Sequence, residues 1–193
     1  MIFEIFLVFF LSYISGSIPF GLILTKLFLK KDIRKIGSRN IGTTNVLRTG
    51  NKFIAILTLF LDILKGVVPV LVTKYYFPNL IYLSGLMAFL GHIFPVWLNF
   101  KGGKGVATYV GIIFALSIKL GLFFCITWAL IIFITKYSSL SSIVSALIIF
   151  LISFFENSFE LNLFLFIVFV IILYTHRQNI VRLKNKTEDK IKL

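Results

Sequence analysis

The sequence predicts an all-α integral membrane protein with about seven transmembrane helices, an N-terminus outside the cell and a cytoplasmic C-terminus. Of its 193 residues, 59% are hydrophobic, and the mean hydropathy is +1.00, whereas a soluble domain has about 45–50% apolar residues. The hydrophobic residues lie in long runs, and about 20 apolar residues are enough to cross a bilayer as a helix. A single membrane domain, residues 1–193, is therefore expected.

The apolar runs define the expected spans in order. The first, residues 2–29, contains Glu4 and lacks both a basic start and a small-residue cleavage site, so a span is expected instead of a cleaved signal peptide. Pro19, between Gly16 and Gly21, is expected to bend or break it. The other spans lie at about 53–76, 80–98, 106–118, 120–135, 140–155 and 159–175, before a short basic cytoplasmic tail at 176–193.

The runs 106–118 and 120–135 could also form one long helix, because only Lys119 and Gly121 separate them. The charges favour two helices. With seven spans, the lysines and arginines fall on the cytoplasmic side as the positive-inside rule requires, and the exceptions are Lys65, Lys74 and Lys119. One fused helix would place the basic tail outside.

The formal net charge is +13. In a soluble protein this value would suggest a nucleic-acid partner. Here the basic residues cap apolar runs, so we expect contact with membrane lipid and no nucleic-acid partner. The chain has one cysteine, Cys125, so no disulfide can form within it.

Two glycine-rich basic stretches, residues 36–48 and 100–108, interrupt the apolar sequence. Glycine allows close backbone approach to a ligand, and successive N–H groups can bind an anion. In the expected topology both stretches face the cytoplasm, as do the 137–142 turn and the 176–179 segment. This arrangement favours a phosphorylated substrate at the inner membrane surface over simple turns. The first stretch has Thr43 and Thr44 in place of the Lys-Ser/Thr of a nucleotide-binding P-loop, so nucleotide hydrolysis is not expected.

Four other polar residues interrupt apolar segments. Asp62 and Lys65 are spaced i, i+3 within a span, which predicts a structural ion pair. His92 is interpreted as a polar residue at a helix interface. His176 lies beside further polar residues and could act as a base, donor or positioning group. No Cys, Asp or Glu cluster accompanies either histidine, so no metal site and no cofactor is expected.

Several motifs in a fixed order carry a family resemblance. They include Gly37-Ser38-x-Asn40-Ile41-Gly42, Gly102-Gly103-Lys104-Gly105 and His176-Arg177-x-Asn179, with further matches at 16–21, 44–48, 62–66, 91–96 and 106–108. From about residue 12 to 183, the chain resembles the bacterial integral-membrane acyl-phosphate:glycerol-3-phosphate acyltransferases. The resemblance implies a seven-helix enzyme of the cell (inner) membrane. It would transfer a fatty acyl group from acyl-phosphate to the 1-hydroxyl of glycerol 3-phosphate, giving lysophosphatidic acid and phosphate in phospholipid biosynthesis.

The resemblance also implies roles for individual residues. Those that resemble the active-site set are Ser38, Arg48, Lys104, Ser142 (with Ser139 as an alternative), His176 and Asn179. Those that would bind substrate phosphate are Asn40, Gly42, Thr44, Asn45, Gly102, Gly103, Thr108 and Arg177. Arg48 and Lys104 would neutralise the two substrate phosphates, and backbone N–H groups of the glycine loops would complete the sites. The expected partners are acyl-phosphate, glycerol 3-phosphate and lipid, with the enzyme that supplies acyl-phosphate as a further candidate.

Two positions depart from the family pattern: Gln178 stands where the family usually has Glu, and Arg39 where it usually has Gly. The first departure argues against a carboxylate base in that turn, and leaves a substrate phosphate or His176 as the proton acceptor. A different function, a small transporter or exporter of a phosphorylated solute, remains an alternative. Such a transporter is expected to have matching broken helices in two repeated halves around a mid-membrane site. The polar motifs instead collect at one surface, which favours an enzyme.

Overall fold

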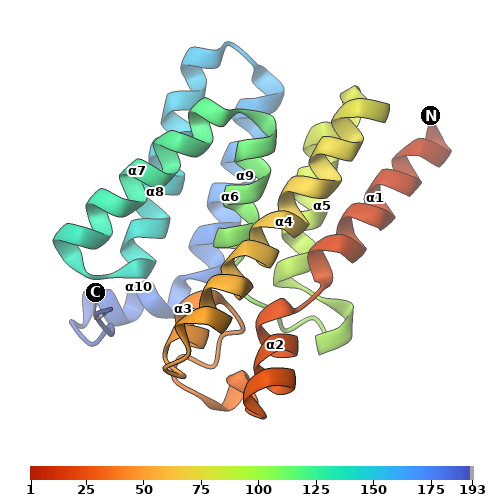
Figure 1. Ribbon diagram of the computed structural model, residues 1–193. Helices are drawn as coiled ribbons and strands as arrows, with labels where there is room; N and C mark the ends of the chain where they lie inside the picture. Colours follow the sequence, from red (N-terminus) through yellow and green to blue (C-terminus); the bar gives the residue numbers. More distant parts are fainter. Residues whose placement is uncertain (192–193) are drawn as a thin grey trace. The chain divides into compact units, whose positions relative to one another are not determined.

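The computed structural model describes residues 1–191, which form helices and connecting loops with no strand among them (Figure 1). Residues 192 and 193, the last of the expected tail, lie outside the described residues. The all-α prediction is thus confirmed. The chain divides into two compact units, Met1–Leu116 and Ser117–Leu193.

The first unit is built around three helices that lie side by side: α1 (Ile2–Ser17), α4 (Lys52–Tyr76) and α5 (Ile81–Ile93) (Figure 1). Helix α1 packs against α5 and α4, and α4 packs against α6. The helices of this unit are α1 (Ile2–Ser17), α2 (Phe20–Leu29), α3 (Thr43–Leu47), α4 (Lys52–Tyr76), α5 (Ile81–Ile93) and α6 (Val106–Leu116), with 3₁₀ turns η1 (Ile33–Lys35), η2 (Pro78–Leu80) and η3 (Val96–Leu98).

The first apolar run breaks at the proline, as predicted. Helix α1 ends at Ser17, Ile18 is extended (φ −64°, ψ 116°), and α2 begins at Phe20. Proline lacks the N–H that a helix interior needs, and the residue before a proline disfavours the α conformation. At the break, the carbonyl of Ile18 accepts from the N–H of Phe20 at 3.1 Å and from the Lys65 ammonium at 2.7 Å.

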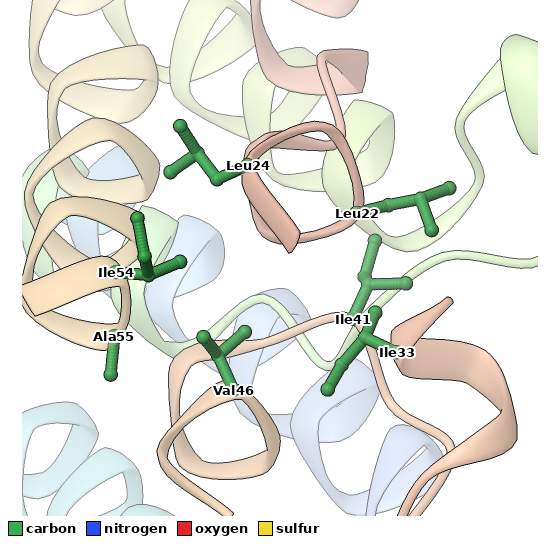
Figure 2. Close-up of a cluster of buried hydrophobic side chains, with 7 residues drawn as sticks. All are labelled: Leu22, Leu24, Ile33, Ile41, Val46, Ile54 and Ala55. Atoms are coloured by element: carbon green, nitrogen blue, oxygen red, sulfur yellow. The ribbon is translucent and has the colours of Figure 1, made fainter. Parts of the chain in front are cut away.

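A small hydrophobic core supports the polar loop between α2 and α4 (Figure 2). It joins the two helices to the loop and to α3 through buried Leu22, Leu24, Ile33, Ile41, Val46, Ile54 and Ala55. Ile36 and Leu98 pack against its edge. Because Ile36 begins the first glycine-rich stretch and Leu98 precedes the second, this core holds both stretches at one end of the unit.

The second unit contains three apolar helices and a short polar one. They are α7 (Ile118–Thr135), α8 (Ser138–Ser153), α9 (Phe159–Thr175) and α10 (Arg177–Lys184), with the 3₁₀ turn η4 (Phe154–Glu156). Helix α8 packs against α7 and α9, and α10 contacts both α8 and α9. The chain beyond α10 turns back, so that the N–H of Ile191 donates to the carbonyl of Lys136 at 2.9 Å.

Five segments of residues 1–191 are long and apolar enough to cross a membrane: Ile2–Leu29, Lys52–Tyr76, Pro78–Leu98, Ile118–Thr135 and Ser138–Glu156. Helices α9 and α10, which meet at a bend of 61°, add a sixth if the two are counted as one span. Helix α6 is apolar but has only 11 residues, short of the roughly 20 that span the hydrocarbon core. The runs 106–118 and 120–135 do form separate helices, because Ser117 is extended (φ −153°, ψ 116°). Seven spans, and the orientation of the termini, remain a prediction.

Candidate functional site

Asn45 organises the first glycine-rich loop. Its side chain is 1% exposed, and its amide nitrogen donates to the carbonyls of Ile33, Ile36 and Asn40 at 3.1, 2.9 and 2.8 Å. Its amide oxygen accepts from the backbone N–H of Ser38 at 3.0 Å. The loop therefore folds around one buried side chain, which fixes the backbone of Ser38 while leaving this residue exposed. The implied contact of Asn45 with substrate phosphate stays a prediction.

Arg48 lies across Gly37 in the same loop. Gly37 has φ +51°, and a Cβ there would lie 2.8 Å from Cδ and 3.1 Å from Nη1 of Arg48. Glycine suits the left-handed backbone at this position, and a Cβ would also lie 2.5 Å from Oδ1 of the buried Asn45, around which the loop folds. The structure thus brings two residues of the implied active-site set, Ser38 and Arg48, onto one rigid loop, and both are exposed. Asn40 closes the turn by accepting from the N–H of Gly42 at 3.3 Å.

The second glycine-rich loop lies against the end of α5. The N–H of Gly102 donates to Ile93 at 3.0 Å and the N–H of Gly103 donates to His92 at 3.1 Å, both to backbone carbonyls. These two N–H groups therefore point into the protein and are not presented to a ligand, contrary to the expected geometry. Gly103 instead matters because it has no side chain. A Cβ there would lie 2.1 Å from Nε2 of His92, so only glycine allows the loop to approach the imidazole this closely. Any part of the two glycines in phosphate binding stays a prediction.

Beneath this loop lies a buried polar network, formed by Asp62, Lys65, His92 and Thr108. The Lys65 ammonium lies 2.8 Å from Oδ1 of Asp62, and both side chains are 2% exposed, so the predicted ion pair is confirmed. Nδ1 of His92 lies 3.2 Å from the Thr108 hydroxyl and 3.8 Å from Oδ1 of Asp62. Thr108 is fully buried, and its hydroxyl faces His92 instead of the surface. Its implied contact with phosphate stays a prediction.

In the second unit, the imidazole of His176 has a defined tautomer. Its Nδ1 lies 2.9 Å from the carbonyl oxygen of Ile172. Because a carbonyl can only accept, Nδ1 carries the proton and Nε2 is the acceptor nitrogen of the neutral ring. The side chain is 2% exposed. Nε2 is therefore the atom that could take up a proton.

Glu188 collects three donors in the second unit. Its Oε1 accepts from Ser139 at 2.7 Å and from the amide of Asn179 at 2.6 Å, and its Oε2 accepts from Nε of Arg182 at 2.7 Å. Partial burial alone would raise the pKa of Glu188, but the three hydrogen bonds and the arginine charge outweigh burial and hold this pKa below its ordinary value. The sequence reasoning missed Glu188. An acidic residue in a basic tail is the signal that could have found it.

The two candidate serines have different surroundings. Ser142 donates to the carbonyl of Ser138 at 2.9 Å and accepts from the indole of Trp128 at 3.1 Å. Ser139 shares its acceptor, Glu188, with Asn179. The geometry thus groups Ser139 with another residue of the implied set, and the choice between the two serines stays open.

The remaining implied phosphate ligands have local positions. Arg177 donates to the carbonyl of Tyr174 at 2.9 Å, and its guanidinium lies 4.3 Å from the centre of the Tyr174 ring. Thr44 is exposed on α3, and Lys104 is half-buried between Gly103 and Gly105. Within residues 1–191, no group of three or more His, Cys, Asp or Glu side chains could hold a metal ion.

Apolar helices long enough to cross a bilayer, with a basic loop between α2 and α4, indicate an integral membrane protein. The chain belongs to the glycerol-3-phosphate acyltransferase family, whose model matches residues 6–186. It is 60% identical over 184 residues to the glycerol-3-phosphate acyltransferase of Pelagibacter ubique (strain HTCC1062), covering 94% of this chain and 95% of the relative. It is 47% identical over 180 residues to that of Mesorhizobium japonicum, covering 93% and 92%.

Solved structures support the same family. The chain is similar to PlsY (YgiH), an integral membrane glycerol 3-phosphate acyltransferase, in its glycerol 3-phosphate form, with a TM-score of 0.93 and 36% identity over 97% of this chain and 96% of that one. The lysophosphatidic acid form gives a TM-score of 0.90 over 97% and 95%. Of the two functions expected from the sequence, these comparisons favour the acyltransferase over the transporter.

Proposed function

We propose that this protein transfers a fatty acyl group from acyl-phosphate to the 1-hydroxyl of glycerol 3-phosphate, at the cytoplasmic face of the inner membrane. Its membership of the glycerol-3-phosphate acyltransferase family supports the acceptor. The similar solved structures, in glycerol 3-phosphate and lysophosphatidic acid forms, support the same substrate and product. The resemblance of the motifs to the acyl-phosphate-dependent enzymes supports the donor.

The observation that carries the proposal is the loop that presents Ser38 and Arg48 from one buried asparagine. An arginine guanidinium can hold a phosphate through two parallel hydrogen bonds, while a lysine ammonium acts as a compact charge. Arg48 and Lys104 accordingly bind the phosphates of the two substrates. Ser38, fixed through its backbone by Asn45, positions a substrate oxygen.

The reaction needs little activation by the protein, because acyl-phosphate is a mixed anhydride. The 1-hydroxyl oxygen attacks the acyl carbonyl carbon, the bond from that carbon to the phosphate oxygen breaks, and phosphate leaves with the electron pair. Placement of the reactants and stabilisation of the carbonyl oxyanion then supply most of the acceleration. The hydroxyl proton passes to a substrate phosphate, whose second pKa is near 6, or to Nε2 of His176.

A donor comparison tests this function. Detergent-solubilised protein is mixed with labelled glycerol 3-phosphate and, in parallel reactions, with acyl-phosphate, with acyl-CoA or with acyl carrier protein that carries a thioester-linked acyl chain. Of these donors, only acyl-phosphate is expected to give labelled lysophosphatidic acid. The product should form without sealed vesicles, which a transporter would need. Product from acyl-CoA but not from acyl-phosphate would reject the proposed donor, and no product from any donor would reject the acyl transfer itself.

A further inference from the structure

The buried polar network of Asp62, Lys65, His92 and Thr108 takes no direct part in the proposed chemistry. It lies within the first unit, with Asp62 and Lys65 on α4, His92 on α5 and Thr108 on α6. The side chains of all four are at most 4% exposed. Charged groups inside a membrane protein are costly and commonly mark function. Replacing a buried ion pair by apolar residues is often neutral for stability or favourable, so stability alone does not account for this one.

The ion pair has neighbours in two other parts of the first unit: the break between α1 and α2, and His92 on α5. The Lys65 ammonium also donates to the carbonyl of Ile18 at the break between α1 and α2. Its contact with Oδ1 of Asp62 is short, but this oxygen makes no hydrogen bond of standard geometry and so retains capacity to accept. The nearby ring nitrogen is Nδ1 of His92, at 3.8 Å. The Thr108 hydroxyl, 3.2 Å from Nδ1, therefore restrains the orientation of the imidazole, and the Asp62 carboxylate lies near the same nitrogen beyond hydrogen-bond distance.

The other side of the imidazole supports the glycine loop. A Cβ on Gly103 would lie 2.1 Å from Nε2 and 3.0 Å from both Cδ2 and Cε1 of His92, so this backbone rests directly on the ring edge. The carbonyl of His92 also accepts from the N–H of Gly103. One residue thus fixes the loop backbone through both its ring and its main chain, and the next residue along is Lys104.

We propose that His92 is a positioning residue for Lys104. Its imidazole, oriented by the Thr108 hydroxyl, supports Gly103 and thereby sets where the Lys104 ammonium meets a substrate phosphate. This inference rests on the proposed function and adds to it. The role assigned to His92 is indirect, because its side chain is buried beneath the loop and acts through the backbone of Gly103.

A double-mutant cycle between His92 and Lys104 tests the inference. His92→Asn keeps a polar atom near the position of Nδ1 but removes the ring edge beneath Gly103. Because small misplacements of a binding group cost up to about a hundredfold in rate, kcat/KM is expected to fall by about tenfold or more in the wild-type background. If His92 acts through Lys104, the same change lowers kcat/KM by less than about threefold when Lys104→Ala is already present.

The control is Ser84→Ala, which removes another buried polar side chain from α5. Ser84 contacts Ser12 at 2.9 Å instead of the loop, so kcat/KM is expected to stay within about twofold of wild type even if thermal stability falls. Thr108→Val supplies a second test variant if His92→Asn does not fold. It removes the hydroxyl beside Nδ1, and its loss of kcat/KM should also disappear in the Lys104→Ala background.

The outcomes separate the two proposals. If wild-type protein makes no lysophosphatidic acid, the proposed function fails. If wild type turns over but His92→Asn matches it, or if the effects of His92 and Lys104 multiply independently, the positioning role is wrong. A loss with Thr108→Val that persists at full size without Lys104 would instead assign Thr108 to direct phosphate contact and would also overturn the inference.

Discussion

The side-chain amide of Asn179 donates to the carboxylate of Glu188 at 2.6 Å. Asn179 lies on α10 and Glu188 follows this helix in the sequence, and the two meet because the tail folds back. The hydroxyl of Ser139, on α8, donates to the same carboxylate oxygen of Glu188 at 2.7 Å. Residues that the family resemblance places in the active-site set are thus held by a tail residue to which no role was assigned from the sequence.

Removing this carboxylate should destabilise the second unit. Glu188→Ala would remove one hydrogen-bond acceptor from each of the buried side chains of Ser139 and Asn179, and the loss of a buried polar group's partner costs up to about 1–3 kcal/mol. Glu188→Gln keeps one acceptor oxygen and should cost less. The unfolding temperature of each solubilised variant measures the loss of stability. The control is Asp189→Ala, which removes the exposed carboxylate of the next residue. An unfolding temperature for Glu188→Ala equal to wild type would show that the three contacts do not hold the tail.

The Glu188 contribution should depend on pH in a defined direction. Its pKa is lower in the folded protein than in the unfolded chain, so the folded state binds fewer protons and the contribution is complete above the unfolded pKa, near 4.3. It is lost as the pH falls through the lower, folded value. The difference in unfolding temperature between wild type and Glu188→Gln should therefore be constant near neutral pH and shrink on acidification. A difference that grows towards low pH would contradict this linkage.

Loss of either proposed phosphate-binding charge should abolish most activity. Arg48→Ala and Lys104→Ala are each expected to lower the rate by on the order of a hundredfold, because a charged group that contacts a substrate phosphate and excludes water on binding contributes several kcal/mol. Both proteins should still insert into the membrane. The matched control is Lys35→Ala, which removes an exposed charge near the start of the same basic loop. Near-normal turnover of both site variants would reject the phosphate-binding role.

Glycine at position 103 should be required for steric reasons. Gly103→Ala would place its Cβ 2.1 Å from Nε2 of His92, so either the loop or the imidazole must move, and a large loss of kcat/KM is expected. Gly50→Ala is the matched control. Gly50 has φ +86°, and no atom lies within 4 Å of the position that a Cβ would take there, so the change should cost about 1–2 kcal/mol of backbone strain with little effect on kcat/KM. Equal kinetic losses would show that the contact with His92 does not account for the effect.

Features that depend on neighbouring residues were predictable from the sequence. The break at Pro19 and the pair of Asp62 with Lys65 follow from local backbone preference and from i, i+3 spacing. The charge distribution predicted two helices within 106–135, but the structure places their separation at Ser117 instead of at Lys119. The inward N–H groups of Gly102 and Gly103 were not predictable, because their acceptors lie on α5 and depend on how the loop packs. The roles of Asn45 and Glu188 likewise depend on partners brought close by tertiary folding.

The length of α6 shows a different limit of the sequence. The apolar run 106–118 predicts a span, but the helix ends at Leu116 and has 11 residues. Hydropathy measures how apolar a segment is, whereas crossing depends also on tilt and on the local thickness of the bilayer. The number of crossings and their direction therefore need a direct measurement.

Single cysteines in a Cys125→Ser background provide that measurement. Asn157 and Asn185 are both exposed, in the turn after α8 and just after α10. A cysteine at Asn157 should react with a membrane-impermeant reagent from outside, and one at Asn185 only after permeabilisation, as the positive-inside rule requires. Ser84, which is fully buried, should label poorly from either side. The reverse pattern would place the glycine-rich loops outside and reject a cytoplasmic active site.

The residue at position 178 tests how the hydroxyl proton is removed. Gln178 is exposed on α10, whereas its neighbour Asn179 is buried, so a carboxylate there would point away from the contacts of Asn179. Gln178→Glu is therefore expected to raise kcat by less than about tenfold, below the roughly 10²–10⁴ typical of a general base, and its negative charge would also oppose anionic substrates. A larger gain would mean that a carboxylate base is missing from this chain.

His176→Asn completes this test. Asparagine can keep a hydrogen-bond donor near the position of Nδ1, which contacts the carbonyl of Ile172, but it lacks the acceptor nitrogen Nε2. If a substrate phosphate takes the proton, His176→Asn should keep the pH dependence of kcat while the rate falls modestly through poorer positioning. If Nε2 is the base, the acidic limb of the profile disappears and the rate drops by the full factor expected for general-base catalysis. We expect the first result, since acyl-phosphate is already activated and both substrates bring a phosphate to the reacting hydroxyl. Loss of the acidic limb in His176→Asn, with an unchanged Gln178→Glu, would assign the proton to His176.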